Sequence, residues 1–250
     1  EAVAVKEVPS SLIVFGGGPV ASEFAQVFAR FGSSVTMLVR SRLLSHDEPE
    51  SGEVLGEVLA SEGVIVRTGV SVTRVAHDGR RFTVSLDDGV VHHAEQLLVA
   101  TGRRADLAAL GVGNLGIDEQ SRTIEVDERM RAGDRLWAIG DVTGRGAFTH
   151  MSMYQADIAA SDILGAATRA ADYRAVPRVT FTDPEVGTVG VTEATARAGG
   201  VSVRTGITRV PSSSRGWIHK AGNDGFIKLV EDADRGVLVG ATSVGPAGGE

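Results

Sequence analysis

Cysteine is absent from this sequence of 250 residues. Without thiols, the chain forms no disulfide, carries no thiolate nucleophile and offers zinc no Cys ligand. Long apolar runs are missing too, since none approaches the ~20 residues that a membrane-spanning helix needs. The first residues, EAVAVKEVPSS, lack the basic start and the apolar stretch of a signal peptide. We therefore expect a soluble protein with a cytoplasmic location and no membrane partner.

Positive charge is also scarce, with 25 Lys and Arg against 32 Asp and Glu and a formal net charge of −7. This balance does not provide the broad basic surface that follows nucleic-acid phosphates, so we expect no nucleic-acid partner. The adjacent His92 and His93 would point to opposite faces of a strand, so no metal site is predicted. A chain of this length buries a core without disulfides or structural metals.

Residues 1–105 have the pattern of a nucleotide-binding α/β domain. The apolar run at 11–16 predicts a strand, the apolar spacing over 19–31 a helix, and the β-branched run at 35–39 a second strand. Together they predict a βαβ unit with parallel strands. A helix over 49–62 follows, and strand 96–100 returns to the same sheet. Between them we expect a small meander of four strands, at 64–66, 70–76, 82–86 and 90–92.

Two further blocks complete the chain. Residues 106–172 predict a turn near 117–123, a strand at 136–139 and a helix from about 152 to 164, which is little for an independent core. Residues 173–250 predict strands and turns with a short helix near 192–198 and a polar loop at 212–217. We expect both blocks to be truncated and to need partner segments outside this sequence.

A dinucleotide fingerprint stands between the first strand and the first helix. Gly16, Gly18 and Ala21 form GxGxxA, in which the first glycine permits the turn and the second lets backbone approach a pyrophosphate. The phosphates would rest at the helix N-terminus, where free N–H groups and the helix dipole favour an anion. The βαβ setting strengthens the match. The alternative is a tight turn that binds no ligand.

The end of the second strand indicates which dinucleotide binds. NAD-binding units place an acid there, which accepts hydrogen bonds from the ribose 2′-hydroxyl. Here Val39 takes that position, Arg40 and Arg42 follow, and no acid occurs between Val35 and Ser45. Two guanidiniums suit a 2′-phosphate, so we predict NADP over NAD, with NAD still possible. The alternative is a pair of solvated surface arginines.

Four segments resemble a known family. LIVFGGGPVASEFAQVFARFGSSVTMLVR, LLVATGRRAD, LWAIGDVTGRGAFTH and VTFTDPEVGTVGVTE are similar to successive signatures of the class I pyridine nucleotide-disulfide oxidoreductases. RSRLLSHDEPESGE and GFIKLVEDADRGVLVGATSVGP resemble the mercuric reductase and dihydrolipoamide dehydrogenase branch. The resemblance implies an α/β protein with a Rossmann-like NAD(P)-binding domain at 1–105 and the C-terminal part of an FAD-binding domain at 106–172. A truncated α+β interface (dimerisation) domain would occupy 173–250.

The resemblance also implies roles for single residues. On the nucleotide side it implies Gly16, Gly18, Val20 and Ala21 around the pyrophosphate, Glu23 beside the nicotinamide, Arg40 and Arg42 at the 2′-phosphate, Thr101 and Gly102 where the chain passes the nucleotide, and Ala147 near the nicotinamide. On the flavin side it implies Asp141 at the ribityl chain and Thr149 as a backbone donor near the isoalloxazine. A carboxylate after a buried strand also suits sugar hydroxyls on general grounds, although Asp141 could simply cap a turn.

Departures from the family pattern limit what this chain does alone. Pro19 replaces an aromatic that gates the flavin in many relatives, and Arg104-Ala105-Asp106 replaces the usual Pro-Asn. The N-terminal FAD segment, the CxxxxC redox pair and the C-terminal His-Glu motif have no counterpart here. We therefore expect a fragment that binds the nucleotide but is inactive and flavin-free by itself, and we predict no catalytic residue within it.

The predicted function of the parent is an NAD(P)H-dependent flavoprotein oxidoreductase. Hydride would pass from NADPH to FAD and on to a disulfide, a mercuric ion or a related small-molecule acceptor. A homodimer through residues 173–250 is implied by the resemblance, with Trp217 and Ile218 as a possible anchor. Two alternatives stay open: a thiol-independent diaphorase or quinone-type reductase, and a flavin-free module for dinucleotide binding and dimerisation.

Overall fold

The computed structural model describes residues 2–166 and 169–250, and these form two compact units. Unit 1 combines the segment that ends at Gly102 with Pro177–Glu250, and unit 2 is Arg103–Val176. The first and third sequence blocks therefore pack into one body. Among the helices in the described ranges, none is long and apolar enough to cross a membrane.

The N-terminal part of unit 1 is built on a four-stranded parallel sheet in the order β3-β2-β1-β7. Its strands are β1 (Ser11–Phe15), β2 (Ser34–Val39), β3 (Ile65–Thr68) and β7 (Gln96–Val99), after a short 3-10 turn η1 (Ala2–Ala4). Helix α1 (Pro19–Arg30) connects β1 to β2, and α2 (Pro49–Ser61) connects β2 to β3. Each helix begins with a proline, whose missing N–H costs nothing in a first turn. The expected βαβ unit with parallel strands is confirmed.

The predicted four-stranded meander is wrong in its first strand. Only β4 (Val72–His77), β5 (Phe82–Leu86) and β6 (Val91–Ala94) form an antiparallel sheet. The stretch predicted as strand 64–66 belongs to β3, which pairs parallel with β2. The reason is α2, because a strand that follows a crossover helix returns to the parallel sheet. The turns expected around Gly79 and Gly89 are present, and both glycines have positive φ.

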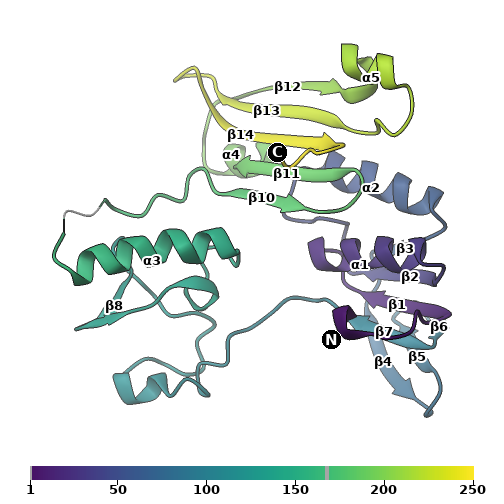
Figure 1. Cartoon of the computed structure of the whole chain (residues 1–250), viewed down its shortest axis with the longest axis horizontal. Helices are drawn as coiled ribbons and strands as arrows, with labels where there is room; N and C mark the ends of the chain where they lie inside the picture. The colour runs from purple at the N-terminus through teal and green to yellow at the C-terminus, as the bar shows by residue number, and fades with distance from the viewer. Residues whose placement is uncertain (1, 167–168) are drawn as a thin grey trace. The chain divides into compact units, whose positions relative to one another are not determined.

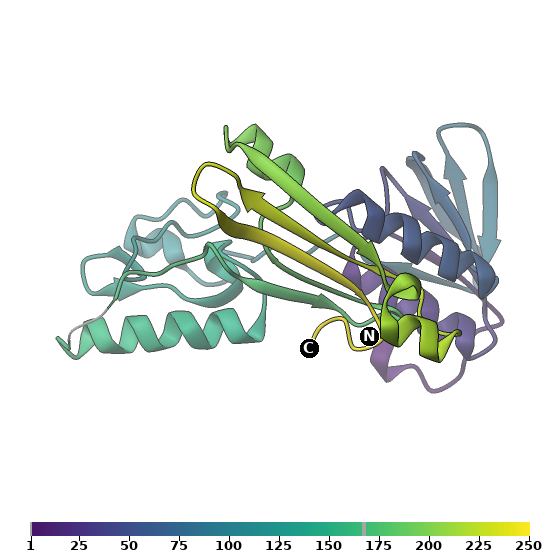
Figure 2. The ribbon, with the colours of Figure 1, turned by 90° about the horizontal axis from the view of Figure 1, so that it is seen from above.

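The C-terminal part of unit 1 is a five-stranded antiparallel sheet in the order β10-β11-β14-β13-β12. Its strands are β10 (Pro177–Thr180), β11 (Glu185–Gly190), β12 (Val203–Arg209), β13 (Phe226–Asp232) and β14 (Val237–Gly245). Figures 1 and 2 both show β12, β13 and β14 side by side. Helix α4 (Glu193–Ala198) lies where a helix was expected.

The polar loop expected at 212–217 is wrong, because the chain there forms a short helical segment. It comprises the 3-10 turn η4 (Val210–Ser212) and helix α5 (Ser214–His219). The Ser213 hydroxyl accepts a hydrogen bond from the Gly216 N–H and so caps α5. A serine-rich run can thus start a helix as readily as it fills a loop.

One hydrophobic cluster holds the two parts of unit 1 together. It contains Val14, Met37 and Leu55 from the parallel-sheet part and Phe226 and Val244 from the antiparallel sheet, all of them fully buried. Burial of each such side chain stabilises the fold by about 1.5–3 kcal/mol. The two sheets therefore share a core.

Unit 2 is smaller and less regular. It contains η2 (Val112–Leu115), β8 (Arg131–Gly133), β9 (Leu136–Trp137), η3 (Gly140–Thr143) and α3 (Thr149–Ile163). Figure 2 shows α3 as one long helix of this unit. The strand predicted at 136–139 extends only to Trp137, and the helix predicted from about 152 begins at Thr149. A 3-10 turn with Gly140 at φ 78° ends the strand early.

Candidate functional site

The three glycines of the turn after β1 differ in the space around them. Gly16 has φ 140°, and a Cβ there would lie 2.4 Å from the Ala100 carbonyl oxygen. A Cβ on Gly17 would lie 2.4 Å from a methyl group of Val39. At Gly18 a Cβ would meet no atom within 4 Å. The first two glycines are therefore required by protein packing, whereas the position beside Gly18 is open.

Helix α1 begins directly after this open position. Its N-cap is Gly18, so no side chain accepts hydrogen bonds from the first turn. Val20 is exposed and Ala21 is fully buried, with its methyl group close to Gly16. The first N–H groups of a helix have no partner within it, and together with the helix dipole they attract an anion. The fingerprint residues thus form a turn that suits a phosphate group.

Thr101 and Gly102 lie at the same edge of the sheet as this turn. Strand β7 runs parallel to β1, and the Ala100 N–H donates to the Phe15 carbonyl at 2.8 Å. Both residues are exposed, and Gly102 has φ 115°. In open α/β sheets this carboxyl edge is where ligands bind.

The two arginines after β2 have different environments. Arg42 donates both N–H groups of Nη1 and both of Nη2 to main-chain carbonyls of its own loop, at 2.7–3.3 Å. Arg40 is exposed, and within the described residues its guanidinium makes no hydrogen bond or ion pair. Arg42 therefore shapes the loop, and Arg40 is the cation that is free to meet a ligand. The role of Arg42 at a 2′-phosphate stays a prediction.

Residues 40–48, which we call the specificity loop because the sequence predicts that its arginines select the nucleotide, contact the glycine-rich turn directly. The Leu44 N–H donates to the Gly17 carbonyl at 2.7 Å. Helix α2 lies close behind, because a Cβ on Gly52 would be 2.5 Å from the Leu43 carbonyl oxygen. A change in the conformation of this loop would therefore alter its hydrogen bond to the glycine-rich turn.

Glu23 and its neighbours on α1 attach the helix to the segment after β10. The Glu23 carboxylate accepts a hydrogen bond from the Phe181 N–H at 2.9 Å. The buried Gln26 side chain exchanges two hydrogen bonds of 2.8 Å with the backbone of Asp183, and Arg30 pairs with its carboxylate. Glu23 therefore has a structural partner, and its place beside a nicotinamide stays a prediction.

The predicted flavin-side residues lie in unit 2. Asp141 is on η3, where its carboxylate is 2.9 Å from Nη2 of Arg103, and both side chains are exposed. An exposed pair of this kind contributes at most about 1 kcal/mol, so ligand hydroxyls can compete for the carboxylate. The buried Gln155 side chain holds this turn, because its amide oxygen accepts a hydrogen bond from the Gly140 N–H at 2.6 Å.

Ala147 and Thr149 are exposed at the start of α3. The N-cap of this helix is Phe148, which offers no side-chain hydrogen bond to the first turn. Thr149 is the first helical residue, so its N–H belongs to the groups that a helix leaves without an internal partner. Its role as a backbone donor near an isoalloxazine stays a prediction.

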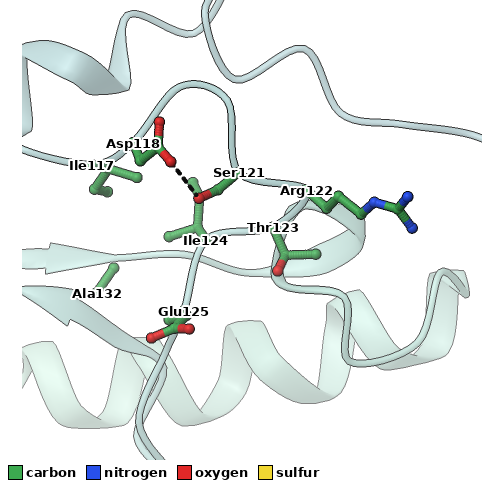
Figure 3. Close-up of a pocket in the computed structure, with 8 residues that line it drawn as sticks. All are labelled: Ile117, Asp118, Ser121, Arg122, Thr123, Ile124, Glu125 and Ala132. Carbon is green, nitrogen blue, oxygen red and sulfur yellow. Dashed lines mark hydrogen bonds between the residues drawn. The ribbon is translucent and has the colours of Figure 1, made fainter.

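Unit 2 also contains a hollow of about 440 Å³. It is lined by the turn at 117–125 and by Ala132 of β8 (Figure 3). The Asp118 carboxylate accepts a hydrogen bond from Ser121 at its rim. None of the predicted binding residues lines it, so we assign the hollow no ligand.

Sequence reasoning missed the polar residues that support the specificity loop. Lys228 is buried in β13, and it shares the core-facing parity of Phe226 and Val230. A lysine that alternates with apolar residues on one face of a strand indicates, from sequence alone, a buried charge. Its partner Glu48, also buried, lies in the HDE run and shows no such signal.

Comparison with protein-family models gives two matches. A model described as pyridine nucleotide-disulphide oxidoreductase matches residues 1–156. A model described as the dimerisation domain of pyridine nucleotide-disulphide oxidoreductases matches residues 176–250. Together the matches cover both parts of unit 1 and most of unit 2.

Individual proteins similar to this chain agree with these matches. A mercuric reductase of Streptomyces lividans is 34% identical over 254 residues, which is 100% of this chain and 53% of that protein. A dihydrolipoyl dehydrogenase of Mycobacterium leprae is 30% identical, covering 98% of this chain and 54% of that protein. The HOCl-induced flavoprotein disulfide reductase RclA from Escherichia coli has a similar structure, with a TM-score of 0.86, 30% identity, and coverage of 98% and 57%. The chain thus spans about half the length of the curated relatives it matches.

Proposed function

The chain belongs to the pyridine nucleotide-disulphide oxidoreductase family, and we propose that it binds NADPH as the nucleotide-binding part of a flavin-dependent oxidoreductase. The observation that carries this proposal is the open position beside Gly18 at the uncapped N-terminus of α1. A pyrophosphate fits there because backbone N–H groups face it and no side chain fills the space. Gly16, Ala21, Thr101 and Gly102 complete the proposed site along the same edge.

Arg40 supports NADPH over NADH. It follows β2 at the position where an NAD-binding unit carries an acid, and its guanidinium has no competing partner among the described residues. A free guanidinium donates paired hydrogen bonds to a phosphate, whereas a 2′-hydroxyl offers it much less. Arg42 contributes by holding the loop that carries Arg40.

Asp141, Ala147 and Thr149 are proposed as the flavin-side residues of the same enzyme. An exposed carboxylate on a rigid turn suits sugar hydroxyls, and the uncapped start of α3 offers a backbone donor. When bound, the nicotinamide and flavin rings supply the hydride chemistry, and the chain binds and orients them. The acceptor we propose is a disulfide, a mercuric ion or a related small molecule, by analogy with the names of the relatives.

A homodimer through residues 173–250 is proposed as the assembly. The match of residues 176–250 to a dimerisation domain supports it. The exposed Trp217 and Ile218 on α5, 72% and 60% accessible, provide an apolar surface of the kind that such contacts bury.

Replacement of Arg40 by glutamate tests the nucleotide assignment. We expect the dissociation constant for NADPH to rise at least about tenfold, since a charge-assisted hydrogen bond is worth ~1.5–3 kcal/mol. The dissociation constant for NADH should change less than about threefold. Arg80→Glu, the same charge change on an exposed turn of the meander, is the control. An unchanged preference between the two nucleotides in Arg40→Glu would overturn the assignment.

A further inference from the structure

Lys228 is the centre of a buried charge cluster that reaches the specificity loop. Its ammonium nitrogen lies 3.0 Å from Oε2 of Glu48, 2.8 Å from Oε1 of Glu50 and 3.1 Å from Oε2 of Glu193. The Lys228 and Glu48 side chains are 6% and 2% exposed. The three N–H donors of the buried ammonium thus meet three carboxylates, of which Glu48 is buried and Glu50 and Glu193 are partly exposed.

Hydrogen bonding keeps the Lys228 ammonium charged in this cluster. Burial alone would lower the pKa of Lys228, but its hydrogen bonds to Glu50, Glu48 and Glu193 outweigh that effect and raise the pKa. Both oxygens of Glu48 are occupied, because Oε1 also accepts from the Glu193 N–H at 2.7 Å. Arg197 supplies a second cation, which pairs with Glu193 at 2.9 Å. Glu48 is therefore held from two sides by the antiparallel-sheet part of unit 1.

Glu48 is the last residue of the specificity loop, and the loop is attached along its length. Asp47, one residue earlier, is 3.6 Å from Nη2 of Arg178 on β10. Leu44 donates to the glycine-rich turn, and Arg42 bonds the loop carbonyls. Arg40 is the first residue of the same loop. The attachments from β10 and β13 therefore act on the same nine residues that carry the proposed nucleotide-selecting cation.

We propose that Lys228 is a positioning residue for nucleotide recognition: through Glu48 it holds the specificity loop in the form in which Arg40 meets the 2′-phosphate. The inference rests on the proposed function, because it takes Arg40 as the phosphate-binding cation. A loop that is ordered before the ligand arrives spares the entropy cost of ordering on binding. The sheet that matches a dimerisation domain thus also determines nucleotide selectivity.

Glu48→Gln is the main test variant. It weakens the link to Lys228 but leaves that lysine two carboxylates, so no buried charge is stranded. Lys228→Met combined with Glu48→Gln is a second variant, which removes both charges together. Glu231, on the same strand as Lys228, forms an ion pair with Arg204 of the neighbouring strand β12, so Glu231→Gln is the matched control that leaves the loop untouched.

The readout is the ratio of the dissociation constants for NADH and NADPH, measured by titration of each purified protein. The two nucleotides share the pyrophosphate, so a general loss of stability or a disturbed turn changes both constants together. We expect the ratio to fall at least about fivefold in Glu48→Gln and further in the double variant, and to stay within twofold in the control. An unchanged ratio in a folded Glu48→Gln would overturn the proposal.

Amide hydrogen exchange of residues 40–48 in the ligand-free proteins provides a readout that does not depend on nucleotide. Faster exchange in Glu48→Gln than in the parent, with exchange in the control unchanged, supports the attachment. Unchanged exchange of residues 40–48 in Glu48→Gln overturns the proposal even if the double variant fails to fold. A parent chain that binds neither nucleotide overturns the proposed function and this inference with it, whereas normal NADPH binding with an unchanged ratio overturns the inference alone.

Discussion

Replacement of Gly18 by alanine should separate nucleotide binding from folding. Gly18 has φ −85° and ψ −176°, a conformation that any residue adopts, and its Cβ would meet no atom within 4 Å. Alanine is a poorer N-cap than glycine, but it lowers the entropy of the unfolded chain, and each effect is worth about 0.5–1 kcal/mol. The two oppose one another, so the free energy of unfolding should change by less than ~1 kcal/mol, or about 4 °C in Tm.

The cost to nucleotide binding is larger. The added methyl group would lie where the pyrophosphate approaches the backbone, and loss of one or two charge-assisted hydrogen bonds costs about 2–4 kcal/mol. We therefore expect the dissociation constant for NADPH to rise roughly 30- to 1000-fold, since each 1.4 kcal/mol is about tenfold. Thermal unfolding and calorimetric titration measure the two effects on the same samples.

Gly206→Ala is the control for this experiment. Gly206 lies in β12, and a Cβ there also meets nothing within 4 Å. By the same entropy effect it should raise Tm by at most about 4 °C, and it should leave the NADPH dissociation constant unchanged. The reasoning is refuted if Gly18→Ala binds NADPH within about twofold of the parent, or if it loses more than ~10 °C in Tm.

Three other substitutions test separate contacts. Gly16→Ala combines a φ of 140° with a Cβ 2.4 Å from the Ala100 carbonyl oxygen, so the free energy of unfolding measured in urea should fall by at least ~2 kcal/mol. Gln26→Leu leaves the Asp183 N–H and C=O unpaired, and a loss of about 2–4 kcal/mol is expected in the same assay; no loss would show that solvent satisfies both groups. Burial raises the pKa of Glu50, but the hydrogen bond to Lys228, a backbone hydrogen bond and the charge of that ammonium together outweigh it and lower the pKa below 4.5. The stabilisation from this carboxylate is therefore present above pH 4.5 and lost as pH falls through the lower folded pKa. Tm of Glu50→Gln should be below that of the parent near neutral pH and should decline less steeply in acid, and parallel Tm curves would contradict this assignment.

Local patterns predicted the local elements well. The run from Ser11 to Val39 combines an apolar strand, a glycine turn, a helical spacing and a second strand, and all four features depend on near neighbours. The Rossmann-like character and the residues of the turn follow from that run. Boundaries were less certain, as the start of α3 at Thr149 shows.

Features that depend on distant partners could not be read from periodicity. Strand β3 is a short β-branched run, like the strands of the antiparallel sheet, and only its pairing with β2 assigns it to the parallel sheet. Arg42 and Arg40 are both arginines, but the fold of the loop places main-chain carbonyls around the Arg42 guanidinium alone. The partners of Lys228 lie up to 180 residues away in sequence, so its parity signals burial without identifying them.

That separation between Glu48 and Lys228 also orders events during synthesis. The 180 residues between the two partners take about 10–35 s to translate at ~5–20 residues per second. The strands of the parallel sheet and the glycine turn are therefore synthesised before the cation that pairs with Glu48. On the proposed function, we expect the growing chain to reach its full affinity for nucleotide only once β13 has left the ribosome.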